Sequence, residues 1–224
     1  MALPFATAPR LSSHFPSPEE LGNVLAGAPR AAREIVARLW LTEGIPSAFL
    51  ASPSSYEGLR GWLASQLNVH PKEITLIGSA RIGYSLAPPP DFGRPFGGKS
   101  DLDLSIISDD LFHRVSSAFS SFSADYRTGT VTPRTQHERD LWDSNLAFGE
   151  RNIPKGFFDP KKVPNFDRYP VVQRVNQSMW MLVKRLEVTP GAPRVHRASS
   201  RVYRDWPSFI ERVSFNLWAA LKAV

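Results

Sequence analysis

Hydrophobic residues recur every three or four positions in several segments, which is the spacing of one helix face. Each such stripe predicts an amphipathic helix. The stripes are Leu59, Trp62, Leu63 and Leu67; Leu111, Val115, Phe119 and Phe122; Val172, Val175, Met179, Leu182 and Leu186; and Ile210, Val213 and Leu217. Residues 19–42 add a helix that is interrupted near Pro29, because proline lacks the amide hydrogen that a helix needs. Trp62, Trp180 and Trp218 lie in or beside these stripes, so we expect them in the core.

Two short segments have the pattern of strands. In residues 73–77, polar and apolar side chains alternate and an apolar run follows. In residues 102–107, apolar and polar side chains alternate. Residues 87–99 between them are rich in proline and glycine, which excludes regular structure there and predicts a loop that joins the two strands. Residues 126–168 show no clear pattern.

Composition excludes several classes of protein. The absence of cysteine rules out disulfide scaffolds, cysteine zinc sites and thiol nucleophiles, and the five histidines lack the close spacing of a zinc-binding helix. The longest apolar runs are under ten residues, whereas a membrane helix needs ~20. Because residues 1–18 contain no continuous apolar stretch, we expect no secretory signal, no membrane partner and a cytoplasmic protein.

The positive charge is concentrated in the last third of the chain. Residues 1–150 carry 13 basic and 16 acidic side chains, whereas residues 151–224 carry 14 basic and 5 acidic ones. A polyanionic partner is therefore expected at the C-terminal end. There, aromatic Tyr203 and Trp206 alternate with basic residues, a pattern that suits RNA or single-stranded DNA. The basic residues proposed for this contact are Arg194, Arg197, Arg201 and Arg204.

The segment that carries chemistry runs from Leu76 to Ile107. Strand alternation places Asp101 and Asp103 on the same face of the second strand. Two carboxylates that share a small volume repel each other unless a cation lies between them, and hard oxygen ligands favour Mg²⁺ or Mn²⁺. Gly78 and Ser79, at the end of the first strand, suit phosphate binding through backbone N–H groups and a hydroxyl. The chemistry indicated is phosphoryl or nucleotidyl transfer with a nucleoside triphosphate.

These residues resemble the signature of the polymerase-β-like nucleotidyltransferases. In that superfamily a Gly-Ser turn precedes an Asp-x-Asp strand, as Gly78-Ser79 precedes Asp101-Leu102-Asp103 here. Gly83 and Ser100 are similar to the branch that contains oligoadenylate synthetases and cyclic-dinucleotide synthases. The resemblance implies that Gly78, Ser79 and Ser100 bind the nucleotide and that Asp101 and Asp103 bind the catalytic metals. The loop between Ser79 and Asp101 is longer than in compact members of the family.

The family usually adds a third carboxylate, which activates the acceptor hydroxyl. Asp159 follows two apolar aromatic residues, so it is the first candidate for this role. Glu138, Asp140 and Asp143 are alternatives, although their segment has the character of a helix surface. The sequence leaves two positions open for the Arg81 side chain: it contacts a phosphate, or it points into solvent.

The resemblance implies an α+β fold with a small mixed sheet, helices on one side and a C-terminal helical region that covers or extends the cleft. We expect an extended leader at 1–18, the nucleotidyltransferase core at 19–168 and a basic helical region at 169–224. The expected activity is Mg²⁺-dependent transfer of a nucleotidyl group to an RNA end, a nucleotide or a protein.

Two other interpretations stay open. The first is an inactive nucleotide- or RNA-binding module that has lost the base and works with a protein partner in a larger complex. The second, suggested by the resemblance and by the small size of the chain, is a toxin or a nucleotidyltransferase of antiviral defence.

Overall fold

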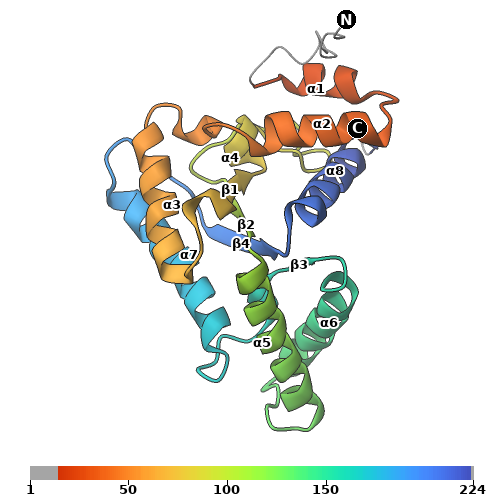
Figure 1. Cartoon of the computed structure of the whole chain (residues 1–224), viewed down its shortest axis with the longest axis vertical. Coiled ribbons are helices and arrows are strands. Elements are labelled where there is room, and N and C mark those ends of the chain that lie inside the picture. The colour runs from red at the N-terminus through yellow and green to blue at the C-terminus, as the bar shows by residue number, and fades with distance from the viewer. Residues whose placement is uncertain (1–14, 223–224) are drawn as a thin grey trace, which may run out of the picture.

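A four-stranded mixed sheet lies at the centre of the computed structural model, which describes residues 15–222 (Figure 1). The strand order is β1 (Ile74–Ile77), β2 (Leu102–Ile107), β4 (Ala198–Tyr203) and β3 (Phe157–Phe158). β2 is antiparallel to β1 and parallel to β4, and β3 is antiparallel to β4. The predicted α+β fold with a small mixed sheet is confirmed, and both predicted strands are present.

Helices surround this sheet in chain order. They are α1 (Pro18–Leu25), α2 (Arg30–Val36), α3 (Pro53–Leu67), α4 (Ser79–Ile82), α5 (Asp109–Arg127), α6 (Gln136–Asn152), α7 (Pro170–Val188) and α8 (Trp206–Lys222). The predicted break near Pro29 separates α1 from α2, and α2 continues as a wide helical turn over Ala37–Thr42. Most of the predicted leader, residues 1–14, lies outside the described residues, and Pro18 already begins α1. None of the described helices is long and apolar enough to cross a membrane.

The two faces of the sheet are covered by different helices. Leu102, Leu104 and Ile106 of β2 pack into one core with α3, α5 and α7. Ile107 joins a second core with residues of α1, α2 and α8. Figure 1 shows α3 beside α7, apart from the pair α2 and α8. The expectation of helices on one side is therefore wrong for α1 and α2, which pack over the second face, whereas α8 belongs to the C-terminal helical region that was expected beside the cleft.

The C-terminal region contributes an inner strand of the sheet as well as helices. β4 lies between β2 and β3 in a register that pairs Asp103 with Ser199 and Ser105 with Arg201. Hydrophobic patterning did not predict this strand. Because β4 pairs with strands on both sides, the sheet joins the residues before 168 to those after it.

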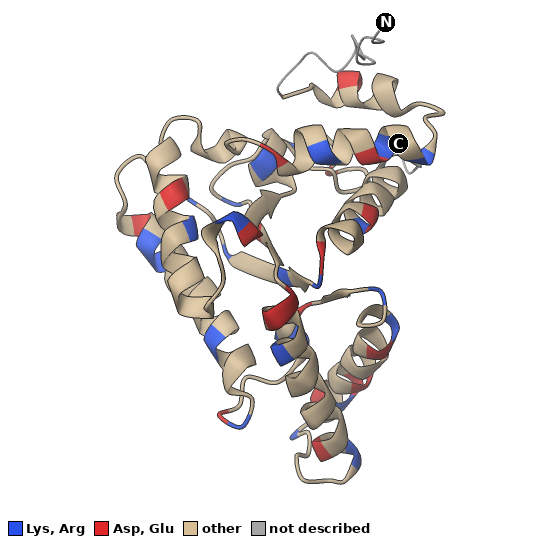
Figure 2. Ribbon diagram, viewed as in Figure 1, with Lys and Arg blue, Asp and Glu red and all other residues tan. Residues whose placement is uncertain are grey.

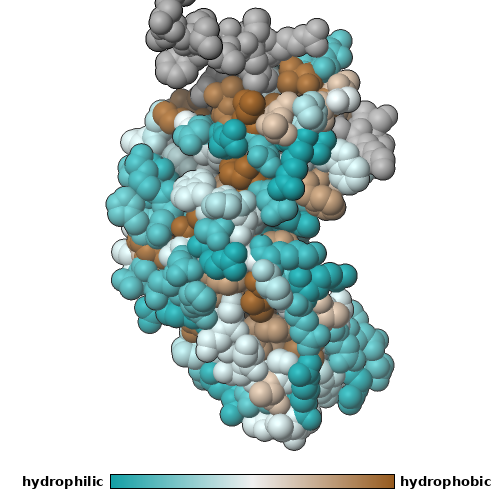
Figure 3. Space-filling model, turned by 45° about the vertical axis from the view of Figure 1, so that its right-hand side comes forward, coloured by the Kyte–Doolittle hydropathy of each residue, from teal (hydrophilic) through white to brown (hydrophobic). Residues whose placement is uncertain are grey.

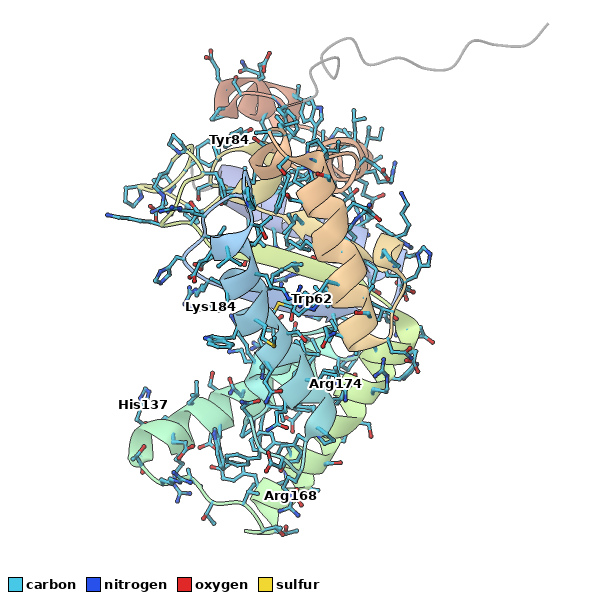
Figure 4. All side chains as sticks on the ribbon, turned by 90° about the vertical axis from the view of Figure 1, so that its left-hand side faces the viewer. Trp62, Tyr84, His137, Arg168, Arg174 and Lys184 are labelled. Carbon is cyan, nitrogen blue, oxygen red and sulfur yellow. The ribbon has the colours of Figure 1, made fainter. Side chains whose placement is uncertain are left out.

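The tryptophans differ in burial. Trp62 points from α3 toward α7 and lies under the Arg185 guanidinium, 4.7 Å from the ring centroid (Figure 4). Trp180 is 65% exposed and Trp218 is 39% exposed, so the expectation that they belong to the core is wrong. Trp218 and Phe215 of α8 are both exposed, and their rings contact each other. Figure 3 shows hydrophobic side chains that reach the surface between hydrophilic ones in the upper part of the molecule.

Candidate functional site

A pocket of about 610 Å³ opens between the sheet and α8. The five predicted nucleotide- and metal-binding residues all line it, namely Gly78, Ser79, Ser100, Asp101 and Asp103. Basic and apolar side chains also line it, the apolar ones being Leu41, Ile77, Leu86, Val213 and Leu217. The structure therefore brings the residues of the sequence motif together in one place, and the C-terminal helix α8 forms part of the wall.

The turn after β1 passes close to a carboxylate. Gly78 has φ +68° and ψ −151°, a conformation that only glycine adopts without strain. A Cβ atom at this position would lie 3.4 Å from Asp103 Oδ2. Ser79 follows as the first residue of the short helix α4. Glycine therefore allows this turn to form beside the carboxylate of the next strand.

Asp101 and Asp103 point to the pocket face of β2, as strand alternation predicts. Leu102 between them is fully buried in the core on the opposite face. Asp103 Oδ1 accepts a hydrogen bond of 2.7 Å from the Ser199 hydroxyl on β4. Arg197 Nε donates to Asp101 Oδ2 at 2.6 Å. This hydrogen bond and the charge of Asp101 raise the pKa of Arg197.

Ser100 organises the loop at the pocket rim. Its hydroxyl accepts a hydrogen bond of 3.1 Å from the Gly97 N–H, and its carbonyl accepts one of 2.9 Å from the His196 N–H. The side chain is buried. Lys99, next to it, lines the pocket. Ser100 therefore lines the pocket, and its hydroxyl stabilises a turn of the Pro/Gly-rich loop.

The structure does not bring Asp159 to the pocket. Its side chain is buried and accepts two hydrogen bonds from the Arg201 guanidinium, one from Nε and one of 2.9 Å from Nη2. Burial lowers the pKa of Arg201, but the hydrogen bonds and charge of Asp159 outweigh burial and raise it. On the neighbouring strand β4, the residue paired with Asp103 is Ser199, so a serine and not a third carboxylate faces the acid pair there.

The alternative third acids are also remote from the pocket. Glu138, Asp140 and Asp143 lie on α6, as their helix-surface character predicts, and none of them lines the pocket. Within residues 15–222, no group of three or more His, Cys, Asp or Glu side chains is placed to hold a metal ion.

The residues expected to contact nucleic acid differ in exposure. Tyr203 is buried and Arg201 is partly buried, whereas the exposed ones are Arg194, Arg197, Arg204 and Trp206. Arg197 turns into the pocket, and Arg201 is held by Asp159. Arg204 donates to Asp205 at 2.8 Å, and Tyr203 is fully buried and cannot stack on a base. Figure 2 shows Lys and Arg spread along much of the ribbon, with acidic residues beside many of them. Tyr203 therefore takes no part in the predicted arginine–aromatic contact, and nucleic-acid binding by the exposed residues stays a prediction.

Arg81 has neither of the roles left open by the sequence. It is 1% exposed and donates to the carbonyl oxygens of Trp40 and Gly44, at 3.0 Å and 2.7 Å. Burial lowers its pKa. Arg81 therefore connects the turn after β1, which carries the pocket residues Gly78 and Ser79, to the segment that follows α2.

The pocket also contains residues that sequence patterns did not indicate. Ser199, on the unpredicted strand β4, donates to Asp103 beside the pocket, and Asn216 of α8 lines the pocket with Val213 and Leu217. Arg197, which the sequence proposed only as a nucleic-acid contact, lies just before β4 and pairs with Asp101. No local motif marks these positions, because they reach the pocket only through the pairing of β4 and the packing of α8.

Comparison of the chain with protein-family models, with curated proteins and with solved structures finds no match. The resemblance to nucleotidyltransferases therefore stays a prediction from the sequence motif, whose residues Gly78, Ser79, Ser100, Asp101 and Asp103 line one pocket.

Proposed function

We propose that the chain is a nucleotidyltransferase, which binds a nucleoside triphosphate and Mg²⁺ in this pocket and transfers the nucleotidyl group to a hydroxyl acceptor. One observation carries the proposal. The Gly78-Ser79 turn and the Asp101/Asp103 pair, which come from different strands, line the same pocket of about 610 Å³. That volume lies within the range of small-molecule sites, ~300–1,000 Å³.

The donor set suits a hard divalent cation. Asp101 and Asp103 present carboxylate oxygens from one strand face, and carboxylates are ligands that Mg²⁺ prefers. Such a site commonly completes its coordination with phosphate oxygens and water. The cation would lower the repulsion between the carboxylates and the triphosphate and would stabilise charge on the phosphate oxygens.

The remaining walls of the pocket suit the two ends of a nucleotide. Arg94, Lys99 and Arg197 supply positive charge where phosphates would lie. Leu86, Val213 and Leu217 supply an apolar surface for a base. The acceptor oxygen would bond to the α-phosphorus, the bond to the pyrophosphate oxygen would break, and the hydroxyl proton would pass to solvent.

Isosteric substitution of the acid pair tests the proposal. Asp101→Asn and Asp103→Asn keep the side-chain shape and remove the charges, whereas Asp109→Asn makes the same change on an exposed residue at the start of α5. We expect each pocket variant to lower pyrophosphate release at least ~100-fold, equivalent to ~2.7 kcal/mol of transition-state stabilisation, with Asp109→Asn unchanged.

The assay uses the four nucleoside triphosphates with Mg²⁺ and a panel of acceptors: RNA, nucleotides and the protein itself. Equal pyrophosphate release by wild type and both pocket variants would overturn the proposal. So would failure of the wild-type protein to bind any nucleoside triphosphate in the presence of Mg²⁺.

A second candidate is Mg²⁺-dependent nucleotide binding without transfer. The observation that favours it is the position of Asp159, whose carboxylate is held by Arg201 outside the pocket. Nucleotide binding that depends on Asp101 and Asp103, without pyrophosphate release from any acceptor, would favour this candidate over the first.

A further inference from the structure

Arg197 is the counter-charge of the acid pair in the pocket. Its backbone is fixed, because its carbonyl accepts a hydrogen bond of 2.8 Å from the Leu102 N–H at the start of β2. Its side chain reaches back across the strands, and Nε donates to Asp101 Oδ2 at 2.6 Å. The guanidinium therefore binds an oxygen of Asp101, which is one of the two carboxylates that would bind the cation under the proposed function.

This ion pair is exposed and open to exchange. The Arg197 side chain is 71% exposed and that of Asp101 is 28% exposed. Exposed pairs between flexible side chains contribute little stability, so a stronger ligand can replace one partner at small cost. By contrast, Asp159 and Arg201 form a buried fork with 9% and 24% of their side chains exposed.

A divalent cation and Arg197 compete for the same carboxylate. A cation that bound Asp101 would displace the guanidinium, which would stay near the pocket because the Arg197 backbone is held by β2. A guanidinium presents a planar fork of N–H donors, which matches two phosphate oxygens. Lys99 and Arg94 line the same pocket, so a phosphate group that enters there meets several positive charges.

We propose that Arg197 is a phosphate-binding residue of this pocket, held by Asp101 until a divalent cation displaces it toward the bound triphosphate. This inference rests on the proposed function. It assigns to Arg197 two opposite effects: the side chain weakens binding of the cation alone and strengthens binding of the phosphate chain.

The test measures the two effects separately. Mn²⁺ alone is titrated against the full-length protein by electron paramagnetic resonance, and inorganic tripolyphosphate is titrated by calorimetry in the presence of Mg²⁺. For Arg197→Ala we expect Mn²⁺ to bind at least about fivefold more tightly, because the competing charge is gone. We expect tripolyphosphate to bind about tenfold more weakly, because a charge-assisted donor fork is lost.

Two matched variants separate contact from net charge. Arg94→Ala removes the same charge from the same pocket, but Arg94 pairs with Asp91 at 3.4 Å in the exposed loop. We expect its Mn²⁺ affinity to stay near that of wild type. Arg197→Lys keeps the charge without the fork, so its Mn²⁺ affinity should stay near wild type while tripolyphosphate binding falls.

Each outcome decides one of the two proposals. If tripolyphosphate and nucleoside triphosphates bind wild type but Arg197→Ala leaves either affinity unchanged, the inference on Arg197 is overturned and the proposed function stands. An equal gain in Mn²⁺ affinity for Arg197→Ala and Arg94→Ala overturns it too. If neither tripolyphosphate nor any nucleoside triphosphate binds wild type, the proposed function fails, and the role of Arg197 fails with it.

Discussion

Asp159 illustrates how the partners of a carboxylate decide its role. Its sequence position after two aromatic residues suggested a catalytic base, but its side chain lies in a buried fork with Arg201. Arg201 in turn lies 5.3 Å from the centroid of the Phe157 ring, beside Tyr203 on β4. Removal of the carboxylate would leave the guanidinium in this environment without a counter-charge, and that is costly. Asp159 therefore has the environment of a structural ion pair.

We predict that Asp159→Ala lowers the free energy of unfolding by ~3–5 kcal/mol, because it breaks a buried pair by removing one partner. The double variant Asp159→Leu/Arg201→Met should recover much of this loss, since neither charge then remains buried. Urea denaturation measures both. Nucleotide affinity of the folded fraction should match wild type, because Asp159 does not line the pocket. A stable Asp159→Ala variant that binds nucleotide but releases no pyrophosphate would instead favour a catalytic role.

The residues of the site that could be predicted from the sequence are those with local signals. Gly78 stands where a strand ends in a turn, and Asp101 and Asp103 follow the period of two of a strand. By contrast, Arg197 and Ser199 contact these acids across 96 residues of chain. A contact at that separation depends on strand pairing, so neither spacing nor composition indicates it.

At the scale of elements, α8 determines the shape of one pocket wall. Val213, Asn216 and Leu217 line the pocket, and Phe209 and Leu217 are buried in the second core. The helix begins after Asp205, whose Oδ1 accepts a hydrogen bond of 2.7 Å from the Ser208 N–H. A hydrogen bond of 2.8 Å from Arg204 and the bond from Ser208 lower the pKa of Asp205. The position of the wall therefore depends in part on this cap.

We predict that Asp205→Ala lowers the free energy of unfolding by ~1 kcal/mol at pH 7, because an N–H of the first turn of α8 loses its acceptor. Asp205→Asn should keep most of the cap. The contribution of the Asp205 charge is present above its unfolded pKa of 3.8 and is lost as pH falls below it, since the folded pKa is the lower one.

Urea denaturation at pH 7 and at pH 3 measures this effect. The stability difference between wild type and Asp205→Asn should shrink at the lower pH, because the carboxyl of the unfolded wild-type chain is then largely protonated, and protonation of the unfolded state offsets the contribution of the folded carboxylate. A difference that stays constant from pH 7 to pH 3 would contradict the assigned role of the charge.

Elements with strong periodicity were predictable, and those stabilised by pairing were not. The stripes of α3, α5, α7 and α8 repeat over several turns and were predicted from the sequence. β3 has two residues, too few to show alternation. The sequence of β4 is Ala-Ser-Ser-Arg-Val-Tyr. Its two serines and its arginine interrupt the alternation of apolar and polar side chains that would predict a strand. Its strand conformation is favoured by hydrogen bonds to β2 and β3 on its two sides.

At the scale of the whole molecule, the excess of basic residues in the last third suggested a polyanionic partner. The structure shows that some of these residues pair with acids of the same chain. Three of the basic residues in the last third each pair with an acid. Arg197 is held by Asp101, Arg201 by Asp159 and Arg204 by Asp205. Two of these acids, Asp101 and Asp159, lie before residue 168. Part of the C-terminal positive charge therefore neutralises acids of the preceding region.

The same long-range connection predicts that the region up to residue 168 does not fold alone. A chain that ends at residue 168 lacks β4, α7 and α8, so β2 loses its parallel partner. It also lacks Val172, Val175, Met179, Leu182 and Leu186 of α7, which complete the core against Leu102 and Leu104. Full burial of one such side chain contributes ~1.5–3 kcal/mol, and a whole domain is stable by only ~5–15 kcal/mol.

We therefore expect the chain that ends at residue 168 to show no cooperative unfolding transition in urea and no dispersed amide spectrum. Co-expression of residues 169–224 as a separate chain is the control, because it supplies β4, α7 and α8 without the covalent link. The two pieces should co-purify and should regain a cooperative transition together. Cooperative unfolding of the shortened chain by itself, at a stability near that of the full chain, would show instead that the boundary near residue 168 separates two independent domains.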